Sequence, residues 1–383
     1  MTIDALEGVP RAELLDDLGL ALETAQEQIR RLICDHPGQI PIFTVAGRWH
    51  FDEDAWAPPW TGGFLAGMVW IFAERTNDPW WSRQAERYSE LLEPRKLDEG
   101  THDIGFLFTP SWGRWHRLHP SDRTRDVIIQ AGRTMAKRFN SAGKYLPTWV
   151  NRGSTFIDVM MNVDIVFQAA ELSGDARLAD IARQHAMTTR RFLVRGDGST
   201  AHEGWFDPDT GEFLKTATHQ GFRSDSCWVR GQAWAIYGFG SVYARTRDER
   251  FLDTARRCAD FYINQTGSRY VPANDWNDPA PEYPYEASAA SIAAAAMLQL
   301  ASLMGAEGAR YREYAAGILR RLCTPEFLGS WKQGCEGILK HAIYHRSNNL
   351  GVDESVMWGD HYFVEALYRI TQDIGEVATP ADG

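Results

Sequence analysis

EASAASIAAAAMLQLA, residues 286–301, consists almost entirely of small and apolar side chains. As a helix it has no extended polar face, and a helix that is apolar on every side is buried. Its many alanines allow neighbouring helix axes to approach closely. This segment is therefore predicted to be an inner helix that other helices enclose.

Five further segments share this composition, and they alternate along the chain with segments that have one polar face. The other apolar segments are TGGFLAGMVWIFAE from Thr61, HDIGFLFTPSW from His102, DVMMNVDIVFQAAEL from Asp158, SCWVRGQAWAIYGFGSVYA from Ser226 and ESVMWGDHYFVEALYRI from Glu354. The amphipathic segments are residues 11–35, NDPWWSRQAERYSELL from Asn77, SDRTRDVIIQAGRTMAKRF from Ser121, GDARLADIARQHAMTTRRF from Gly174, RDERFLDTARRCADFYI from Arg247 and EGARYREYAAGILRRL from Glu307. An amphipathic helix lies outside, with its apolar face on the core.

Six inner and six outer helices in alternation predict an all-α fold, an (α/α)6 barrel. We expect a single catalytic domain over residues 1–383 with short flexible N- and C-terminal ends. An open helical solenoid is the alternative, but its helical pairs should be more regular in length than these.

The loops that lead into the inner helices are long and rich in Gly, Pro, Asp and Trp. They include AWAPPWTGG from Ala55, DEGTHDIG from Asp98, YLPTWVNRGSTFID from Tyr145, THQGFRSDSCWVRGQ from Thr218 and YVPANDWNDPAPEYPYEAS from Tyr270. In an alternating ring these loops meet at one mouth. Polar residues at the starts of the buried helices then converge on one cavity, where we place the functional site.

Asp103 in THDIGFLF and Asp158 in STFIDVMMN each open an inner helix. A carboxylate at a helix start is most often an N-cap, which accepts hydrogen bonds from free backbone N–H groups. Two carboxylates that face each other across a cavity have a second possible role, because burial and mutual repulsion raise one pKa and keep one acid neutral. Paired carboxylates suit glycosidic chemistry. The local sequence leaves both interpretations open.

Charged residues inside or near the apolar helices are further candidates. Arg230 and Trp234 lie on one helix face at i, i+4. An arginine in an apolar helix needs an anionic partner, either a protein carboxylate or one from a ligand. His341 and His345 in HAIYH have a spacing compatible with a metal, but no glutamate completes a metalloprotease motif. No metal and no cofactor are predicted.

The charge, hydropathy and cysteine content of the chain exclude several classes of protein. The net charge of −11 argues against nucleic acid as a partner, whereas a small anionic ligand remains compatible with one buried arginine. The acidic N-terminal stretch does not resemble a secretory signal, and we find no run of about eighteen apolar residues that would predict a membrane span. The five scattered cysteines form no CxxC pair and favour a reducing cytoplasm.

Six ordered motifs together resemble the unsaturated glucuronyl hydrolases of glycoside hydrolase family 88. They are PPWTGGFLAGMVW, HDIGFLF, STFIDVMMN, FDPDTGE, THQGFRSDSCWVRGQAWAIYGF and SVMWGDHYFVEAL. The resemblance implies an (α/α)6 barrel that acts on small anionic oligosaccharides left by polysaccharide lyases, whose terminal uronic acid carries a C4=C5 double bond. It also implies the chemistry: a carboxylic acid protonates C4, water adds at C5, and the hemiketal opens to a 4-deoxy-5-keto uronate.

The same resemblance assigns site residues. It implies that Asp158 is the general acid and base, and that Asp103 supports the acid and the substrate hydroxyls. The implied substrate-binding residues are Trp60, Phe64, His102, Trp149, His202, Gln220, Arg230 and Trp234. Among them, the resemblance implies that Trp60, Phe64 and Trp234 line the unsaturated ring. For His202, the residues alone favour a surface histidine, whereas the resemblance implies contact with the sugar or the attacking water.

The chain departs from the family pattern at Arg223 and Ser224, where acidic residues are usual. The extra arginine either favours a more anionic substrate or lies at the surface, and the surface reading is favoured. Alternative functions are an unsaturated rhamnogalacturonyl hydrolase of pectin breakdown, a sugar-binding barrel, and a sugar epimerase, which would need paired catalytic histidines. The parent polysaccharide is not specified, and either a monomer or a homodimer is expected.

Overall fold

The protein is a double ring of helices, seen in a computed structural model that describes residues 11–51 and 59–378. The outer helices are α1 (Arg11–Asp35), α3 (Pro79–Leu92), α6 (Asp122–Ala136), α9 (Ala176–Phe192), α11 (Glu249–Thr266) and α13 (Ala309–Leu322). The inner positions hold α2 (Gly62–Thr76), α4 (Ile104–Phe108) with α5 (Arg114–Leu118), α7 (Val159–Asn162) with α8 (Asp164–Ser173), α10 (Val229–Thr246), α12 (Ala287–Met304) and α14 (Met357–Ala378). The predicted all-α fold is confirmed. The predicted ends, residues 1–10 and 379–383, lie outside the described residues, as does most of the segment before Trp60 in the first predicted mouth loop.

The ring is closed. Helix α14 packs against α12 on one side and against α2 on the other, so the first and last inner helices bury apolar surface on each other. An open solenoid would leave those two helices apart. The solenoid alternative is therefore wrong.

Glycines set how closely the inner helices approach one another. A Cβ atom added to Gly63 of α2 would lie 1.9 Å from the carbonyl oxygen of Phe106 in α4. One added to Gly105 of α4 would lie 2.3 Å from the Cα of Asn162 in α7. No side chain fits at these crossings, which confirms that small residues allow the close approach.

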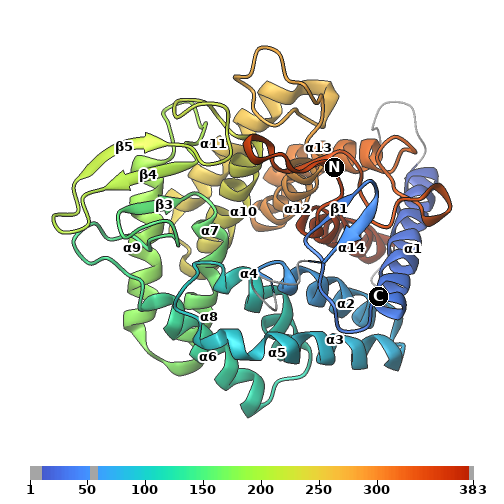
Figure 1. Ribbon diagram of the computed structural model, residues 1–383, viewed down its shortest axis with the longest axis horizontal. Coiled ribbons are helices and arrows are strands. Elements are labelled where there is room, and N and C mark those ends of the chain that lie inside the picture. Colours follow the sequence, from blue (N-terminus) through green and yellow to red (C-terminus); the bar gives the residue numbers. More distant parts are fainter. Residues whose placement is uncertain (1–10, 52–58, 379–383) are drawn as a thin grey trace.

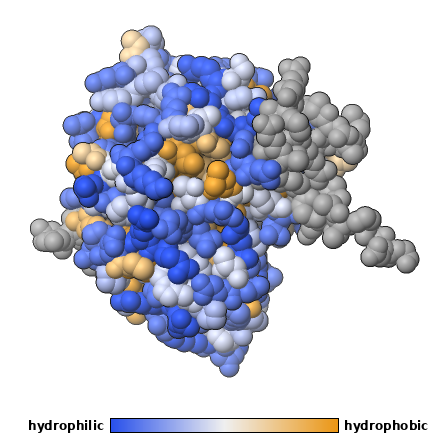
Figure 2. Space-filling model, turned by 90° about the vertical axis from the view of Figure 1, so that its right-hand side faces the viewer, coloured by the Kyte–Doolittle hydropathy of each residue, from blue (hydrophilic) through white to orange (hydrophobic). Residues whose placement is uncertain are grey.

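Helix α12 corrects the sequence prediction on apolar runs. The segment Ala287–Leu322 contains a window that is long and apolar enough for a membrane span, whereas no such window was expected from the sequence. In the structure 67% of that window is buried, so neighbouring helices cover its apolar surface. On the face of the molecule shown in Figure 2, hydrophilic side chains predominate and apolar side chains form small groups between them.

Four of the outer helices, α3, α6, α9 and α11, begin with side-chain caps. Asp78, Asp175 and Asp248 each accept a hydrogen bond from the backbone N–H two residues further on. Ser121 starts α6 with a capping box. Each cap satisfies a backbone donor that has no partner within its helix.

Short strands interrupt the loops at the mouth, where the sequence indicated few alternating patterns. The antiparallel sheets are β1 (Phe43–Val45) with β2 (Arg48–His50), β3 (Ser154–Phe156) with β4 (Glu203–Phe206) and β5 (Phe213–Ala217), and β6 (Ala342–His345) with β7 (Leu350–Glu354). The β3–β4–β5 sheet lies at the upper left of Figure 1. Because β3 leads into α7 and β7 leads into α14, these sheets position the loops that enter the inner ring.

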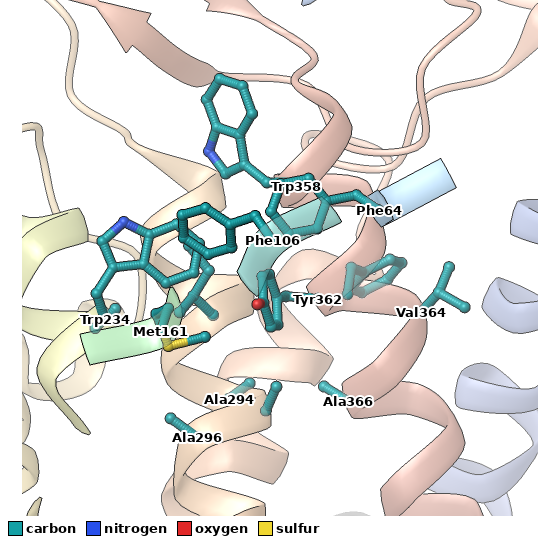
Figure 3. Close-up of a cluster of buried hydrophobic side chains, with 14 of the residues drawn as sticks. Phe64, Phe106, Met161, Trp234, Ala294, Ala296, Trp358, Tyr362, Val364 and Ala366 are labelled. Carbon is teal, nitrogen blue, oxygen red and sulfur yellow. The ribbon is translucent and has the colours of Figure 1, made fainter. Parts of the chain in front are cut away.

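Aromatic side chains fill the ring beneath the mouth. Phe106 of α4 lies with its ring centre 5.2 Å from those of Phe64 of α2 and Trp234 of α10. Tyr362 of α14 lies 5.3 Å from Trp234, and Figure 3 shows these rings converging from different helices. The barrel is therefore a packed core with a cavity above it, not an open pore.

Candidate active site

A cavity of about 310 Å³ opens at the mouth of the ring, above the aromatic cluster. Nine of the ten residues predicted from the sequence line it: Asp103, Asp158, Trp60, His102, Trp149, His202, Gln220, Arg230 and Trp234. Its volume is at the lower end of the range for small-molecule sites. The chemical roles of these residues stay predictions, but their side chains come together in one place.

Phe64 is the exception, and its predicted contact with the unsaturated ring is wrong. The side chain has no exposed surface and lies behind Trp60 and Phe106, at ring distances of 5.8 and 5.2 Å. It sits further along α2 than the mouth, so Trp60 and Phe106 separate it from the cavity. Phe106 lines the cavity in its place.

The two predicted acids do not cap their helices. Asp158 precedes α7 with helical backbone angles, φ −60° and ψ −27°, and its side chain makes no capping hydrogen bond. Asp103 precedes α4 and makes none either. The capping aspartate Asp78, in contrast, has an extended backbone with ψ 119°. The N-cap interpretation of Asp158 is therefore wrong, and both carboxylates line the cavity instead.

Asn162 joins the two helices that carry these acids. Its side-chain oxygen accepts a hydrogen bond from the backbone N–H of Phe106 at 2.7 Å, and its side-chain nitrogen donates to the carbonyl oxygen of Asp158 at 3.2 Å. The hydroxyl of Thr101 donates to Asp103 Oδ2 at 2.9 Å. A change in the distance between Asp103 and Asp158 would break these hydrogen bonds. The bonds therefore fix the positions of the two carboxyl groups relative to each other.

Asp158 has the properties of a neutral acid. Burial raises the pKa of its carboxyl from 3.8 to about 7, and the charge of Asp103 adds to the increase, whereas Arg230 opposes it. Its Oδ1 atom has no hydrogen-bond partner among the described residues. A carboxyl group that is partly protonated at neutral pH and unpaired on one oxygen can donate a proton to a bound molecule.

His202 lies beside this carboxyl group and is not the surface residue that its loop suggested. It is 3% exposed, and its Nδ1 atom accepts backbone N–H groups from His219 and Gln220 at 3.1 and 3.2 Å. The remaining proton is then on Nε2, which lies 3.8 Å from Asp158 Oδ1. Burial holds the pKa of His202 well below its ordinary value, so the ring is neutral and acts as a hydrogen-bond donor to the cavity.

Arg230 provides the positive charge of the site. Its guanidinium donates to the carbonyl oxygens of Ile343 and Tyr344 and to Gln220 Oε1. Glu286, which is fully buried, lies 3.9 Å away, so a protein carboxylate is close but makes no direct hydrogen bond. Glu286 is therefore the protein carboxylate that accompanies Arg230, and an anionic ligand as a second partner stays a prediction.

Comparisons with known proteins identify the family of the chain. A sequence model described as Glycosyl Hydrolase Family 88 matches residues 34–264. The chain belongs to glycosyl hydrolase family 88. An unsaturated glucuronyl hydrolase of Formosa agariphila is 34% identical over 319 residues, which cover 81% of this chain and 79% of that protein.

Solved structures of family 88 show the same fold. The unsaturated glucuronyl hydrolase of Bacillus sp. GL1, described as responsible for the degradation of glycosaminoglycan, has a TM-score of 0.87 and 28% identity, covering 92% of this chain and 96% of that one. A mutant of the Streptococcus agalactiae enzyme, complexed with dGlcA-GalNAc6S, has a TM-score of 0.80 and 25% identity, with coverage of 97% and 99%. The chain is a family 88 glycoside hydrolase with an (α/α)6 barrel.

Several residues that line the cavity of this family 88 enzyme were not predicted as site residues. They are Ile42, Pro59, Phe106, Phe156, His219, Tyr344 and His345. Tyr344 and His345 belong to β6, whose short strand gave no signal that it returns to the mouth. The sequence indicated His345 only as half of a histidine pair with metal-compatible spacing. Burial and nearby His219 lower its pKa to about 4, so it too is neutral.

Four buried polar atoms of the cavity-lining residues have no partner among the described residues: Asp158 Oδ1, His102 Nδ1, His202 Nε2 and His345 Nε2. A buried polar atom without a partner costs free energy of roughly 1–3 kcal/mol. Their convergence in one cavity indicates that a polar ligand or water completes these bonds.

The histidine pair first considered for a metal does not form a site. His341 Nδ1 lies 2.7 Å from Asp353 Oδ1, whereas His345 faces the cavity. His361 contacts the carbonyl oxygen of Phe64 and lies 3.6 Å from Glu365. Over residues 11–51 and 59–378 no three His, Cys, Asp or Glu side chains are grouped to hold a metal ion.

Arg223 is an exposed residue, as the favoured interpretation held. Its Nε atom lies 2.8 Å from Asp225 Oδ1, and its guanidinium rests over the ring of Phe222. It does not line the cavity. The departure from the family pattern at this position therefore does not alter the catalytic cavity directly.

The pKa of Asp158 predicts the pH dependence of the enzyme. If the protonated carboxyl group is the acid, kcat/KM should fall as pH rises through about 7, approaching a tenfold loss per pH unit above it. Initial rates measured from pH 5 to pH 9 on one substrate test this. A rate that increases steadily from pH 7 to pH 9 would contradict the assignment.

Proposed function

We propose that this protein hydrates the C4=C5 double bond of the unsaturated uronic acid at the non-reducing end of lyase-generated oligosaccharides. The observation that carries the proposal is the place of Asp158: burial raises the pKa of its carboxyl to about 7, its unpaired oxygen lies beside His202, and the charge of Arg230 is nearby. Glycoside hydrolysis at the anomeric carbon needs no acid directed at C4. A vinyl ether needs one strong proton donor and one water.

The proposed reaction uses one proton of Asp158. The carboxyl group transfers its proton to C4, and positive charge develops at C5 next to the ring oxygen. A water molecule attacks C5 and gives up a proton to the Asp158 carboxylate, which restores the acid. The bond from C5 to the ring oxygen of the hemiketal then breaks, which leaves a ketone at C5 and a hemiacetal at C1. This hemiacetal releases the remaining sugar as an alcohol and becomes an aldehyde, so the product is a 4-deoxy-5-keto uronate. The net change is the addition of one water.

The remaining residues orient this chemistry. The uronate carboxylate is attracted by the guanidinium of Arg230, which Gln220 also contacts at 2.8 Å. The neutral Nε2–H of His202 donates a hydrogen bond to the attacking water or to a sugar hydroxyl. Trp60 and Trp234 provide aromatic surfaces for the sugar ring. The charge of Asp103 raises the pKa of Asp158 and so helps to keep the proton on that carboxyl group.

Relatives support this reaction class without specifying the parent polysaccharide. The related enzymes act on unsaturated glucuronyl groups by their names, and the Streptococcus agalactiae mutant binds dGlcA-GalNAc6S. At identities of 25–34% such substrate details do not transfer to this chain. We therefore propose a small anionic unsaturated oligosaccharide as the substrate, of disaccharide size or longer.

Turnover should consume the conjugated double bond and should not need a metal. We expect the ultraviolet absorbance of the C4=C5 uronate to decay on at least one member of a panel of lyase-generated disaccharides, at the same rate with and without chelator. The reason is that the proton comes from a side chain, and the described residues offer no grouped metal ligands. The panel should include a rhamnogalacturonan-derived sugar, which distinguishes the pectin-type alternative.

This experiment has three distinguishable outcomes. Decay that persists with chelator and yields a 5-keto uronate by mass spectrometry supports the proposal. Loss of decay on addition of chelator, with recovery on added metal, would contradict the mechanism. Turnover of only the pectin-derived sugar would contradict the proposed substrate but would support the proposed hydration chemistry.

A further inference from the structure

A second hollow, of about 400 Å³, lies beside the catalytic cavity and shares Trp149 with it. We call this second hollow the groove. Its walls come from the loop before Asp103, the C-terminal end of α6, and the loop 147–152 before Asp158. Trp149 is 48% exposed and its edge meets His219 at a ring distance of 5.8 Å. A sugar chain that leaves the catalytic cavity past Trp149 would enter this groove.

The groove carries more positive than negative charge. Lys137, Arg138 and Arg152 line it together with one carboxylate, Glu99. The carboxylate is engaged by Lys137, whose Nζ atom lies 2.6 Å from Glu99 Oε1. Arg152 is exposed and forms no ion pair with any residue in the described ranges. The groove is therefore a region of positive charge on a chain whose net charge is −11.

Arg138 is held in place by neutral acceptors. Its guanidinium donates to the carbonyl oxygens of Pro147, Thr148 and Glu99. These bonds tie together the loops that precede Asp103 and Asp158, but within the described part of the chain no carboxylate contacts the guanidinium directly. The positive charge of Arg138 therefore remains available to an anion in the groove.

We propose that the groove is a subsite for an acidic group on the leaving part of the substrate, either the carboxylate of a second uronic acid or a sulfate ester. Both groups present oxygen pairs that a guanidinium binds well. Arg152 makes the direct contact, Lys137 and Arg138 add attraction, and Trp149 supports the intervening sugar ring. The inference rests on the proposed function, and it makes the enzyme selective for substrates with a second negative charge.

Two substitutions with opposite effects test the subsite. Arg152→Gln should raise KM for acidic leaving groups by about three- to tenfold with little change in kcat, and more so at low ionic strength. Glu99→Gln should lower KM for the same substrates, because it frees Lys137. Arg152→Lys should restore part of the loss. Arg223→Gln is the matched control, because this exposed arginine lies outside both hollows.

The substrates are an unsulfated unsaturated disaccharide, its sulfated counterpart, and an unsulfated unsaturated tetrasaccharide that contains a second uronate. A larger KM change on the sulfated disaccharide assigns the groove to sulfate, and one on the tetrasaccharide assigns it to the carboxylate. Equal changes on all three sugars, or no opposite effect of Arg152→Gln and Glu99→Gln, would overturn the subsite.

The unsulfated disaccharide keeps this test separate from the proposed function. If the wild-type protein converts none of the three sugars, the proposed function fails. Calorimetric titration of the same sugars into the wild-type and Arg152→Gln proteins then decides the groove alone. Equal affinities of the two proteins for every sugar would overturn it.

Discussion

Asp158→Asn should lower kcat by about 10² to 10⁴-fold while the protein stays folded. The amide has the shape of the carboxyl group but cannot deliver a proton to C4 at neutral pH. KM should change little, because Arg230 and the aromatic side chains of the cavity are untouched. The measurement is the decay of the conjugated uronate absorbance at saturating substrate. Activity close to that of the wild type would contradict the role of Asp158.

The stability of this variant provides an independent check. In the folded state the pKa of Asp158 is raised from 3.8 to about 7, so the free energy of unfolding falls as pH rises across that interval. The variant has no such charge to bury. It should therefore melt at the same or a higher temperature than the wild type at pH 8.

Asp164→Asn is the matched control for the acid. Asp164 is the first residue of α8, six residues after Asp158, and pairs with Arg245 outside the cavity. This variant should keep turnover and lose only the modest stability of a partly exposed ion pair, about 0.2–1 kcal/mol. Equal loss of turnover in both variants would indicate a general effect on the fold.

Arg230→Ala should raise KM by roughly 10- to 100-fold, because it removes a charge-assisted contact with the substrate carboxylate. It should also shift the pH profile. Arg230 lowers the pKa of Asp158, so its removal raises that pKa and moves the loss of activity to higher pH. A purely structural defect would reduce activity without moving the profile. Measurement of kcat and KM across pH separates the two.

Controls for this variant come from the same helix. Arg245 lies at the other end of α10, in ion pairs with Asp164 and Glu171, and Arg245→Ala should leave KM and the pH profile unchanged. Arg230→Lys retains the charge but not the planar donor pair, so it should recover the pH profile better than KM. An unshifted profile in Arg230→Ala would contradict the coupling to Asp158.

The helical ring was predictable because its signal is spread over whole segments. Apolar residues on every side, and glycines such as Gly63 and Gly105, mark inner helices wherever they occur in the chain. The strands were not predictable, because strands such as β3 are only three residues long and show no usable alternation. Tertiary contacts with β4 hold that strand.

The site was predictable only in part, and the misses have physical causes. Asp78 and Asp158 each precede a helix, yet one caps and the other does not. The difference lies in the backbone ψ angle of the aspartate itself, 119° for Asp78 and −27° for Asp158, which the local pattern does not encode. Phe64 was misplaced because an all-apolar helix does not reveal which turn reaches the cavity. His345 was missed as a site residue because it arrives from a hairpin far along the chain.

The contact of α14 with α2 bears on how the enzyme comes into being during synthesis. Helix α14 and the β6–β7 hairpin are among the last parts of the ring to leave the ribosome, long after Asp103, Asp158 and Arg230 have emerged. Until then the side of α2 that packs against α14 lacks that neighbour, and the cavity lacks the wall that holds Tyr344 and His345. A nascent chain of this protein thus contains every proposed catalytic group before its active site is complete. Its exposed inner helices need protection from aggregation during that time.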